Sequence, residues 1–466
     1  MQTILSIIIL VWLIFRIRKI YFTNDVQMRV VRRIWDEPYL LSPNMYFTIF
    51  TICTAPIFLG SLSLFKYALW FLLILALIFT RVIRIRWEWM TITYALFFAW
   101  LCVTMTYTPV PRDGAMMLIK YSLPMLFLWL GYSSLSNEKD VIVLLKVVNI
   151  VGCVYCCFIG GQGCKLMPWL YYGVLAGPFS TYAGFADFLT SIFIVPILLY
   201  WLTKDRKYVY CALWMVLSTV LESVRTGMGG MLLVFAFAVL LKDRWKAMPG
   251  LMLAGAVFVG TILFVPDVNK KFFGEEAGKV TATDIVQGGA ISLDNIEMSG
   301  REYMWERTKE ACYKGHENLG SGLGTSGHFI KYSDSEIEGQ VSGKLHNDYL
   351  ELMCDTGNVG IALLILFYLT VILKVFVNVA MRRSSSMVSV TGIMALSSMA
   401  GIAFCMYFDN VVSNSMQSMV MPYIYLGFFL KALEIEKLEK WGKQKPMTVQ
   451  SPAGFTFTLG NYGYYY

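Results

Sequence analysis

Residues 345–380 read LHNDYLELMCDTGNVGIALLILFYLTVILKVFVNVA and pass from a polar segment into an apolar one. The second part, from about residue 357, is long and apolar enough to be a helix that crosses a bilayer. The first part, residues 345–357, contains His346 and has the pattern of a helix that continues into this span. These residues therefore predict a membrane helix joined directly to an extramembrane segment that carries polar side chains.

The same apolar pattern recurs along the rest of the chain. Of its 466 residues, 57% are hydrophobic and only 15% are charged, which is a lower charged share than soluble domains have. Candidate spans lie at about 2–15, 45–65, 67–80, 90–109, 115–134, 141–161, 182–202, 208–223, 226–241, 248–265, 357–380, 387–408 and 412–430. We therefore predict an all-α polytopic membrane protein with about 12–13 transmembrane helices.

The basic residues indicate how the chain is oriented. A net charge of +8 is compatible with nucleic-acid binding, but the lysines and arginines gather at span ends, so we expect no nucleic-acid partner. With the amino end outside, connections on the inner side carry 23 basic residues, and the short outer ones carry only Lys66, Arg112 and Lys165. The positive-inside rule then places the long loop that precedes residue 357 on the outer face.

Four regions follow from this organisation. Transmembrane helices are expected over residues 1–265 and 357–433, and an extracytoplasmic loop with the catalytic groups over 266–356. Residues 434–466 are expected to be a disordered cytoplasmic tail. All three histidines of the chain (His316, His328 and His346) lie in the loop, so the loop is where titratable chemistry is expected.

Arg225 is the first candidate site residue. It stands in ESVRTGMGG, where two apolar runs meet at the outer face. The simple alternative is an arginine that extends from a span end into the interface. Against it, the short outer connections are nearly free of basic residues, and the glycines after Arg225 permit close backbone approach. A cation held at this surface is suited to an anionic headgroup, above all a phosphate.

Arg301 and His346 are the candidates within the loop. Arg301 lies in the first turn of the helix expected at REYMWERTK, where a solvated charged face is the alternative reading. His346 opens HNDYLEL, and a loop histidine is often structural, although imidazole titrates near neutral pH. The spacing of the histidines matches no zinc motif, so no metal is expected. The glycine-rich GSGLGTSG (320–327) predicts a tight turn rather than a phosphate cradle, because it lacks the strand and the lysine of a nucleotide loop.

The order of these motifs resembles the bacterial O-antigen ligase and O-antigen polymerase superfamily. The resemblance covers about residues 90–430 and rests on SVRTG between two spans, REYMW at the start of the loop helix, the GLG turn, and LHNDYLELMCDTGNVGIALLILF. It implies a fold similar to the C-type glycosyltransferases, with Arg225, Arg301 and His346 at the family's functional positions. The segment at 177–199 departs from the family, because the expected asparagine is not in its place. Asp187 lies nearby, with no role assigned.

The resemblance also implies a function and its partners. A member of this superfamily acts in a bacterial cytoplasmic (inner) membrane on a glycan linked to undecaprenyl diphosphate. The expected reaction is an inverting, metal-independent and cofactor-independent transfer to an acceptor glycan hydroxyl by a polymerase. Arg225 and Arg301 would bind the diphosphate, and His346 and Arg301 would be catalytic. The alternatives are a ligase, with lipid A core or a protein as acceptor, and a transporter, for which only Lys120 and Lys146 are basic candidates within spans.

Overall fold

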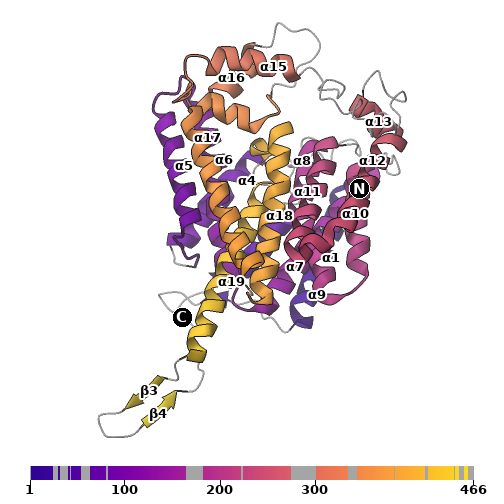
Figure 1. Ribbon diagram of the computed structural model, residues 1–466, viewed down its shortest axis with the longest axis vertical. Coiled ribbons are helices and arrows are strands. Elements are labelled where there is room, and N and C mark those ends of the chain that lie inside the picture. The colour runs from indigo at the N-terminus through magenta and orange to yellow at the C-terminus, as the bar shows by residue number, and fades with distance from the viewer. Residues whose placement is uncertain are drawn as a thin grey trace.

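The computed structural model describes residues 2–24, 30–31, 40–41, 43–53, 63–79, 82–163, 182–221, 224–273, 301–333, 344–382, 384–414, 418–444, 447–450 and 456–459. Its helices form one bundle, shown in Figure 1 with α15 and α16 lying across one end. Two short antiparallel hairpins, β1–β2 and β3–β4, accompany the helices. The prediction of an all-α membrane protein is confirmed, the two hairpins apart.

The elements follow one another along the chain in simple order. The helices are α1 (Gln2–Thr23), α2 (Pro43–Cys53), α4 (Ser63–Phe79), α5 (Trp89–Met105), α6 (Pro111–Ser134), α7 (Glu138–Gly163), α8 (Tyr182–Ile192), α9 (Ile194–Thr203), α10 (Lys207–Leu221), α11 (Arg225–Asp243), α12 (Met248–Phe264), α13 (Pro266–Phe273), α15 (Arg301–Thr308), α16 (Thr325–Ser333), α17 (Asp348–Val375), α18 (Ser386–Phe408) and α19 (Val420–Gln444). Short helical turns are η3 (Arg244–Ala247), η6 (Lys309–Tyr313), η8 (Phe376–Met381) and η9 (Val412–Asn414). The strands are β1 (Val30–Val31), β2 (Leu40–Leu41), β3 (Met447–Gln450) and β4 (Thr456–Leu459).

Six of the described helical segments are long and apolar enough to cross a membrane. They are 111–134, 138–157, 184–203, 225–243, 348–381 and 386–408, and four shorter apolar helices accompany them at 70–79, 89–105, 207–221 and 248–264. The count of 12–13 spans stays a prediction, because among the described residues only these segments have that length or apolar character.

Several helix boundaries differ from those expected. α1 continues to Thr23 instead of ending near residue 15, and the span expected at 182–202 is divided at Phe193 into α8 and α9. The last span begins at Val420, after the turn η9, instead of at 412. Within the tail expected to be disordered, α19 continues to Gln444 and β3 pairs with β4. Hydropathy locates apolar runs well, but helix ends depend on capping and on neighbouring helices.

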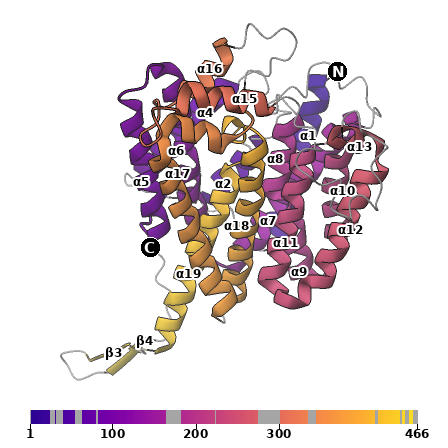
Figure 2. The ribbon, with the colours of Figure 1, turned by 45° about the horizontal axis from the view of Figure 1, so that its top comes forward.

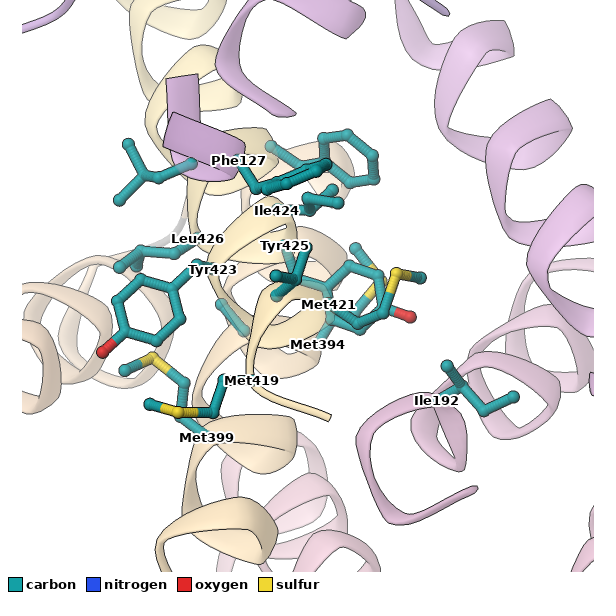
Figure 3. Packing of buried hydrophobic residues seen from close by; sticks show 14 of the residues in the cluster. Phe127, Ile192, Met394, Met399, Met419, Met421, Tyr423, Ile424, Tyr425 and Leu426 are labelled. Carbon is teal, nitrogen blue, oxygen red and sulfur yellow. The ribbon is translucent and has the colours of Figure 1, made fainter. Parts of the chain in front are cut away.

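Glycines bring the central helices into close contact. A Cβ on Gly131 of α6 would lie 2.2 Å from the carbonyl oxygen of Ile424 in α19, and one on Gly427 would lie 2.1 Å from that of Leu128. Backbones can approach this closely only where a side chain is missing, which is a common way for membrane helices to pack. Figure 3 shows the adjoining core, in which aromatic and methionine side chains of α19 pack with Phe127 and with Met394 of α18.

The elements η6, α16 and the start of α17 share a small core of their own. Cys312, Ile330, Leu345, Leu350 and Cys354 form one buried cluster. This cluster joins η6 and α16 to the first turns of α17. At Gly357 the backbone leaves helical geometry (φ 65°, ψ −171°), and α17 changes direction there from the outer layer into the bundle (Figure 1). The helix expected at 345–357 and the span that follows it are therefore a single kinked element.

The basic connections lie at the other end of the bundle. Lys204 and Lys207 stand at the junction of α9 and α10, and Lys242 is in the last turn of α11. Arg244, just after it, donates a hydrogen bond to the carbonyl oxygen of Ala380 in η8. In Figures 1 and 2 these helix ends lie opposite α15 and α16. The asymmetry of basic residues along the sequence therefore corresponds to two different ends of the folded molecule.

Candidate functional site

Three segments that are distant in the sequence meet at the end of the bundle covered by α15 and α16. They are the first turn of α15, the residues just before α17, and the turn that follows α18. Trp305 of α15 donates a hydrogen bond from Nε1 to the carbonyl oxygen of Leu345 at 2.8 Å. The Trp305 ring also meets Tyr407 edge to face, with 6.0 Å between ring centroids. This tryptophan therefore holds the loop helix against both of the other segments.

His346 is held by the turn after α18. Its ring Nδ1 lies 3.1 Å from Oδ1 of Asp409, and its backbone N–H donates to Oδ1 of Asn410 at 3.0 Å. The His346 side chain is 21% exposed and that of Asp409 is 8% exposed. With Nδ1 donating its proton to the carboxylate, Nε2 keeps its lone pair. The pair thus leaves Nε2 of His346, a nitrogen that can accept a proton, beside the buried carboxylate of Asp409.

The backbone at His346 adopts a left-handed conformation, with φ 54°. Such a conformation is uncommon for a residue other than glycine and is found where surrounding contacts enforce it. The contacts come from the next two residues. Asn347 caps α17 by accepting a hydrogen bond from the Leu350 N–H at 3.0 Å, and Asp348 Oδ2 accepts from Val412 N at 3.0 Å. The helix start and the turn after α18 together position the imidazole.

Arg301 approaches the same turn from the loop helix. Its Nη1 donates to the carbonyl oxygen of Phe408 at 2.6 Å. Burial lowers the pKa of Arg301 from its ordinary value, and the neighbouring Asp409 acts in the opposite direction. A guanidinium has five N–H donors, and one hydrogen bond to a carbonyl leaves others for a ligand. The structure therefore brings Arg301 and His346 together at Asp409.

Arg225 lies at the same end of the bundle on another pair of helices. It opens α11, and its Cζ is 5.7 Å from the ring centroid of Phe272 in α13. The next residue, Thr226, accepts a hydrogen bond at its carbonyl from Cys405 Sγ at 3.6 Å. Cys405 in turn accepts the Asp409 N–H at its own carbonyl, at 2.9 Å. One helical turn of α18 therefore links the start of α11 to Asp409. Glu222, expected beside Arg225, lies outside the described residues.

The other two histidines are not part of this meeting point. His328 Nδ1 lies 2.7 Å from Asp113 Oδ2, and both side chains are well exposed. This contact joins α16 to the first turn of α6. His316 takes part in a backbone turn, where its N–H donates to Tyr313 and its carbonyl accepts from Gly320. Of the three histidines, His346 is the one whose carboxylate partner, Asp409, directly follows the residue that Arg301 contacts.

The glycine-rich segment 320–327 forms a tight turn against α17 and α6. Gly320, Gly322 and Gly324 all have positive φ, at 80°, 105° and 85°. The carboxylate of Asp355 accepts the N–H groups of Gly324 at 2.6 Å and Ser326 at 2.8 Å. These donors are thus already used by a carboxylate of the protein. The segment is a tight turn, as the sequence predicted, and it sets the direction of α16.

Substitution in this turn is expected to destabilise the protein. A Cβ at Gly320 would lie 2.3 Å from the carbonyl oxygen of Asp355, whereas one at Gly315 would meet nothing within 4 Å, at a similar φ of 88°. Gly315→Ala is expected to cost about 1 kcal/mol from conformation alone. Gly320→Ala is expected to cost roughly 3 kcal/mol or more, because the backbone must also shift. Thermal unfolding of both purified variants measures the difference, and equal melting temperatures would contradict it.

Two residues of the site were not found by sequence reasoning. Asp409 and Asn410 received no role, although they interrupt an apolar stretch between two predicted spans. A carboxylate and an amide between two apolar spans indicate a functional site, and this signal can be read from the hydropathy of the sequence. Their pairing with His346 needs the folded chain. Among the described residues, no group of three His, Cys, Asp or Glu side chains is placed to hold a metal ion.

The two basic residues expected within spans have partners close by. Lys146 donates a hydrogen bond to Asn24 Oδ1 at 3.0 Å. Lys120 lies near the carboxyl groups of Glu351 and Asp348 and near the like-charged Lys344, which precedes His346 by two residues. Lys120 therefore belongs to the surroundings of the candidate site rather than to a separate path through the bundle.

Comparison with known families identifies the central part of the chain. Residues 210–365 match the family model for O-antigen ligase. This segment, about a third of the chain, is similar to that family. The expected resemblance is thereby confirmed, and the match supports glycan transfer of the O-antigen ligase or polymerase type in a multi-pass membrane protein. The matched O-antigen ligase segment runs from α10 into α17 and contains Arg225, Arg301 and His346. A search of curated proteins finds no match.

Proposed function

We propose that the protein is a membrane glycosyltransferase that moves a glycan from undecaprenyl diphosphate to a hydroxyl group of an acceptor glycan. The proposal rests on the positions of Arg301 and His346. Arg301 Nη1 lies 2.6 Å from the carbonyl oxygen of Phe408, and His346 Nδ1 lies 3.1 Å from Oδ1 of Asp409, the next residue. A guanidinium suits the charge that develops on a departing diphosphate. An imidazole oriented by a carboxylate suits removal of a proton from a hydroxyl.

The proposed reaction is a single displacement at the anomeric carbon. The acceptor oxygen attacks as its proton passes to Nε2 of His346, and the bond to the diphosphate oxygen breaks with the electron pair leaving on the diphosphate. Arg301 and Arg225 stabilise that group, so a lipid diphosphate needs little help from a general acid. One displacement inverts the anomeric configuration. The reaction as proposed needs neither a metal nor a cofactor.

The proposed orientation follows from the same geometry. We infer that the end of the bundle with α15 and α16 faces the periplasm or outer surface, because the basic connections lie at the opposite end. Residues 266–356 would then be the extracytoplasmic catalytic loop between the helices of 1–265 and 357–433, with 434–466 in the cytoplasm. The membrane would be the bacterial inner membrane, where lipid-linked glycans are assembled.

A ligase is the second candidate, since the matched family is described as O-antigen ligase. It would use the same donor and the same three residues, with lipid A core or a protein as acceptor. A deletion strain separates the two candidates. Single lipid-linked repeat units accumulate if a polymerase has been lost, and long unattached chains accumulate if a ligase has been lost. Incubation of purified protein with a synthetic undecaprenyl-diphosphate oligosaccharide tests transfer itself. No elongated or transferred product would contradict the proposal.

Asp409→Asn is expected to lower kcat by roughly ten- to a hundredfold, less than loss of the base itself. An amide keeps the shape of the side chain, but it does not stabilise a protonated imidazole as a carboxylate does. Because the donor is held by the arginines, its KM should change little. Steady-state kinetics of the two proteins measure this. A large rise in KM with kcat unchanged would show that Asp409 serves binding instead.

A further inference from the structure

Phe272 of α13 lies over the arginine that opens α11. The Cζ atom of Arg225 is 5.7 Å from the centroid of the Phe272 ring. At this distance a guanidinium is attracted by the partial negative charge on the face of an aromatic ring. Unlike a carboxylate, the ring does not neutralise the cation. Arg225 can therefore be held by Phe272 and still attract a diphosphate.

A cluster of apolar side chains fixes α13 to α11 and α12. Its buried members are Met228, Ile262, Val268 and Phe273, and Phe272 packs against them. Met228 is three residues after Arg225 on α11, so both residues lie on the same face of that helix. Asn269 of α13 also donates a hydrogen bond from Nδ2 to the carbonyl oxygen of Ile262 in α12, at 3.2 Å. The position of Phe272 beside Arg225 is therefore set by the packing of three helices.

α13 is an amphipathic helix on the surface of the bundle. Val268 and Phe273 are 0% and 6% exposed, whereas Asp267 and Lys270 are exposed. One face of α13 thus packs on the bundle, and the other carries charged side chains. Figures 1 and 2 both show α13 at the end of the bundle on which α15 and α16 lie. The contact between Phe272 and Arg225 is therefore at the same end as the candidate site.

We propose that Phe272 is a positioning residue for the donor, because its ring holds the Arg225 guanidinium where it binds the diphosphate of the lipid-linked glycan. The inference rests on the proposed glycosyl transfer and adds a residue that acts on donor binding. An arginine side chain has many rotamers, and ordering it on binding costs free energy. A ring that already favours one position lowers this cost. Phe272 acts through Arg225 and takes no part in proton transfer.

Phe272→Leu tests the inference, since leucine keeps an apolar side chain but has no aromatic face. The KM for the synthetic undecaprenyl-diphosphate oligosaccharide is expected to rise roughly three- to tenfold, as for loss of a cation–π contact, with kcat nearly unchanged. Phe272→Tyr keeps the aromatic face and should restore the KM of the wild type. Steady-state kinetics measure all three proteins. A wild-type KM in Phe272→Leu would overturn the inference, as would equal KM values in the leucine and tyrosine variants.

The double variant shows whether the ring acts through the arginine. In an Arg225→Ala background, Phe272→Leu is expected to cause no further rise in KM, because the contact has already been removed. Independent, multiplying effects of the two substitutions would overturn the inference.

Phe273→Leu is the matched control for the packing of α13. Phe273 is the next residue and is buried in the cluster with Met228 and Ile262. Its substitution is expected to lower the melting temperature and to leave the KM for the donor unchanged. If Phe273→Leu raised this KM as much as Phe272→Leu does, the placement of α13 and not the ring would set donor affinity, and the inference would be wrong.

Binding of geranylgeranyl diphosphate separates this inference from the proposed function. The shift in melting temperature with increasing ligand gives the affinity without any transfer reaction. A wild-type protein that transfers no glycan overturns the proposed function. The inference is then decided by this ligand. Weaker binding to Phe272→Leu than to the wild type and Phe272→Tyr supports it, and equal binding, or no binding to the wild type, overturns it.

Discussion

His346→Asn is expected to lower kcat for glycan transfer by roughly 10²- to 10⁴-fold, with the protein inserted at the wild-type level. Asparagine tolerates positive φ better than most residues, so the backbone at φ 54° need not rearrange. The amide can still contact Asp409, but it has no basic nitrogen to take the proton of the acceptor hydroxyl. Kinetics with a synthetic lipid-diphosphate donor measure the loss.

His328→Asn is the control for this variant. His328 also pairs with a carboxylate, that of Asp113 at 2.7 Å, but it lies on α16 and contacts none of the three segments that meet at Asp409. Activity close to that of the wild type is expected. If His328→Asn lost as much activity as His346→Asn, the assignment of the base would be wrong, and full activity of His346→Asn would remove it altogether.

Arg301→Ala is expected to lower kcat by roughly 10²- to 10³-fold, the loss typical of removing one donor to a developing negative charge. Arg301 is partly buried and contacts the Phe408 carbonyl, so the remaining donors of its guanidinium are held in a defined position. Arg301→Lys keeps the charge but lacks the planar fork, and it should recover only part of the rate. Kinetics of both variants with a lipid-diphosphate donor test this order.

Arg307→Ala is the control that distinguishes loss of the Arg301 charge from a disturbance of α15. Arg307 lies in the last turn of the same α15, and its removal is expected to leave transfer nearly unchanged. Comparable losses in Arg301→Ala and Arg307→Ala would show that the position of α15, and not a contact with diphosphate, limits the rate. The melting temperatures of the two variants show whether α15 is disturbed.

The order of the helices and the candidate site residues could be predicted from the sequence. Apolar runs predicted the long helices, and glycine spacing predicted the turn at 320–327, because both depend on neighbouring residues. The first or last residues of α1, α8 and α19 could not be predicted from the sequence. They depend on caps, on the turn at Phe193 and on the packing of other helices. The resemblance to O-antigen ligases rested on Arg225, Arg301 and His346, all within the matched segment 210–365.

The sequence alone determined that this chain is a helical membrane protein with its histidines in one polar loop, because hydropathy and the placement of charge are local properties of the chain. Only the tertiary structure decided which carboxylate holds His346. Asp409 is 63 residues further along, beyond the two membrane-length helices α17 and α18, and nothing in its own segment indicates its partner. Likewise, only the packing of α8, α11 and α18 shows that Asp187 is buried, since the surroundings of a polar group depend on which helices meet.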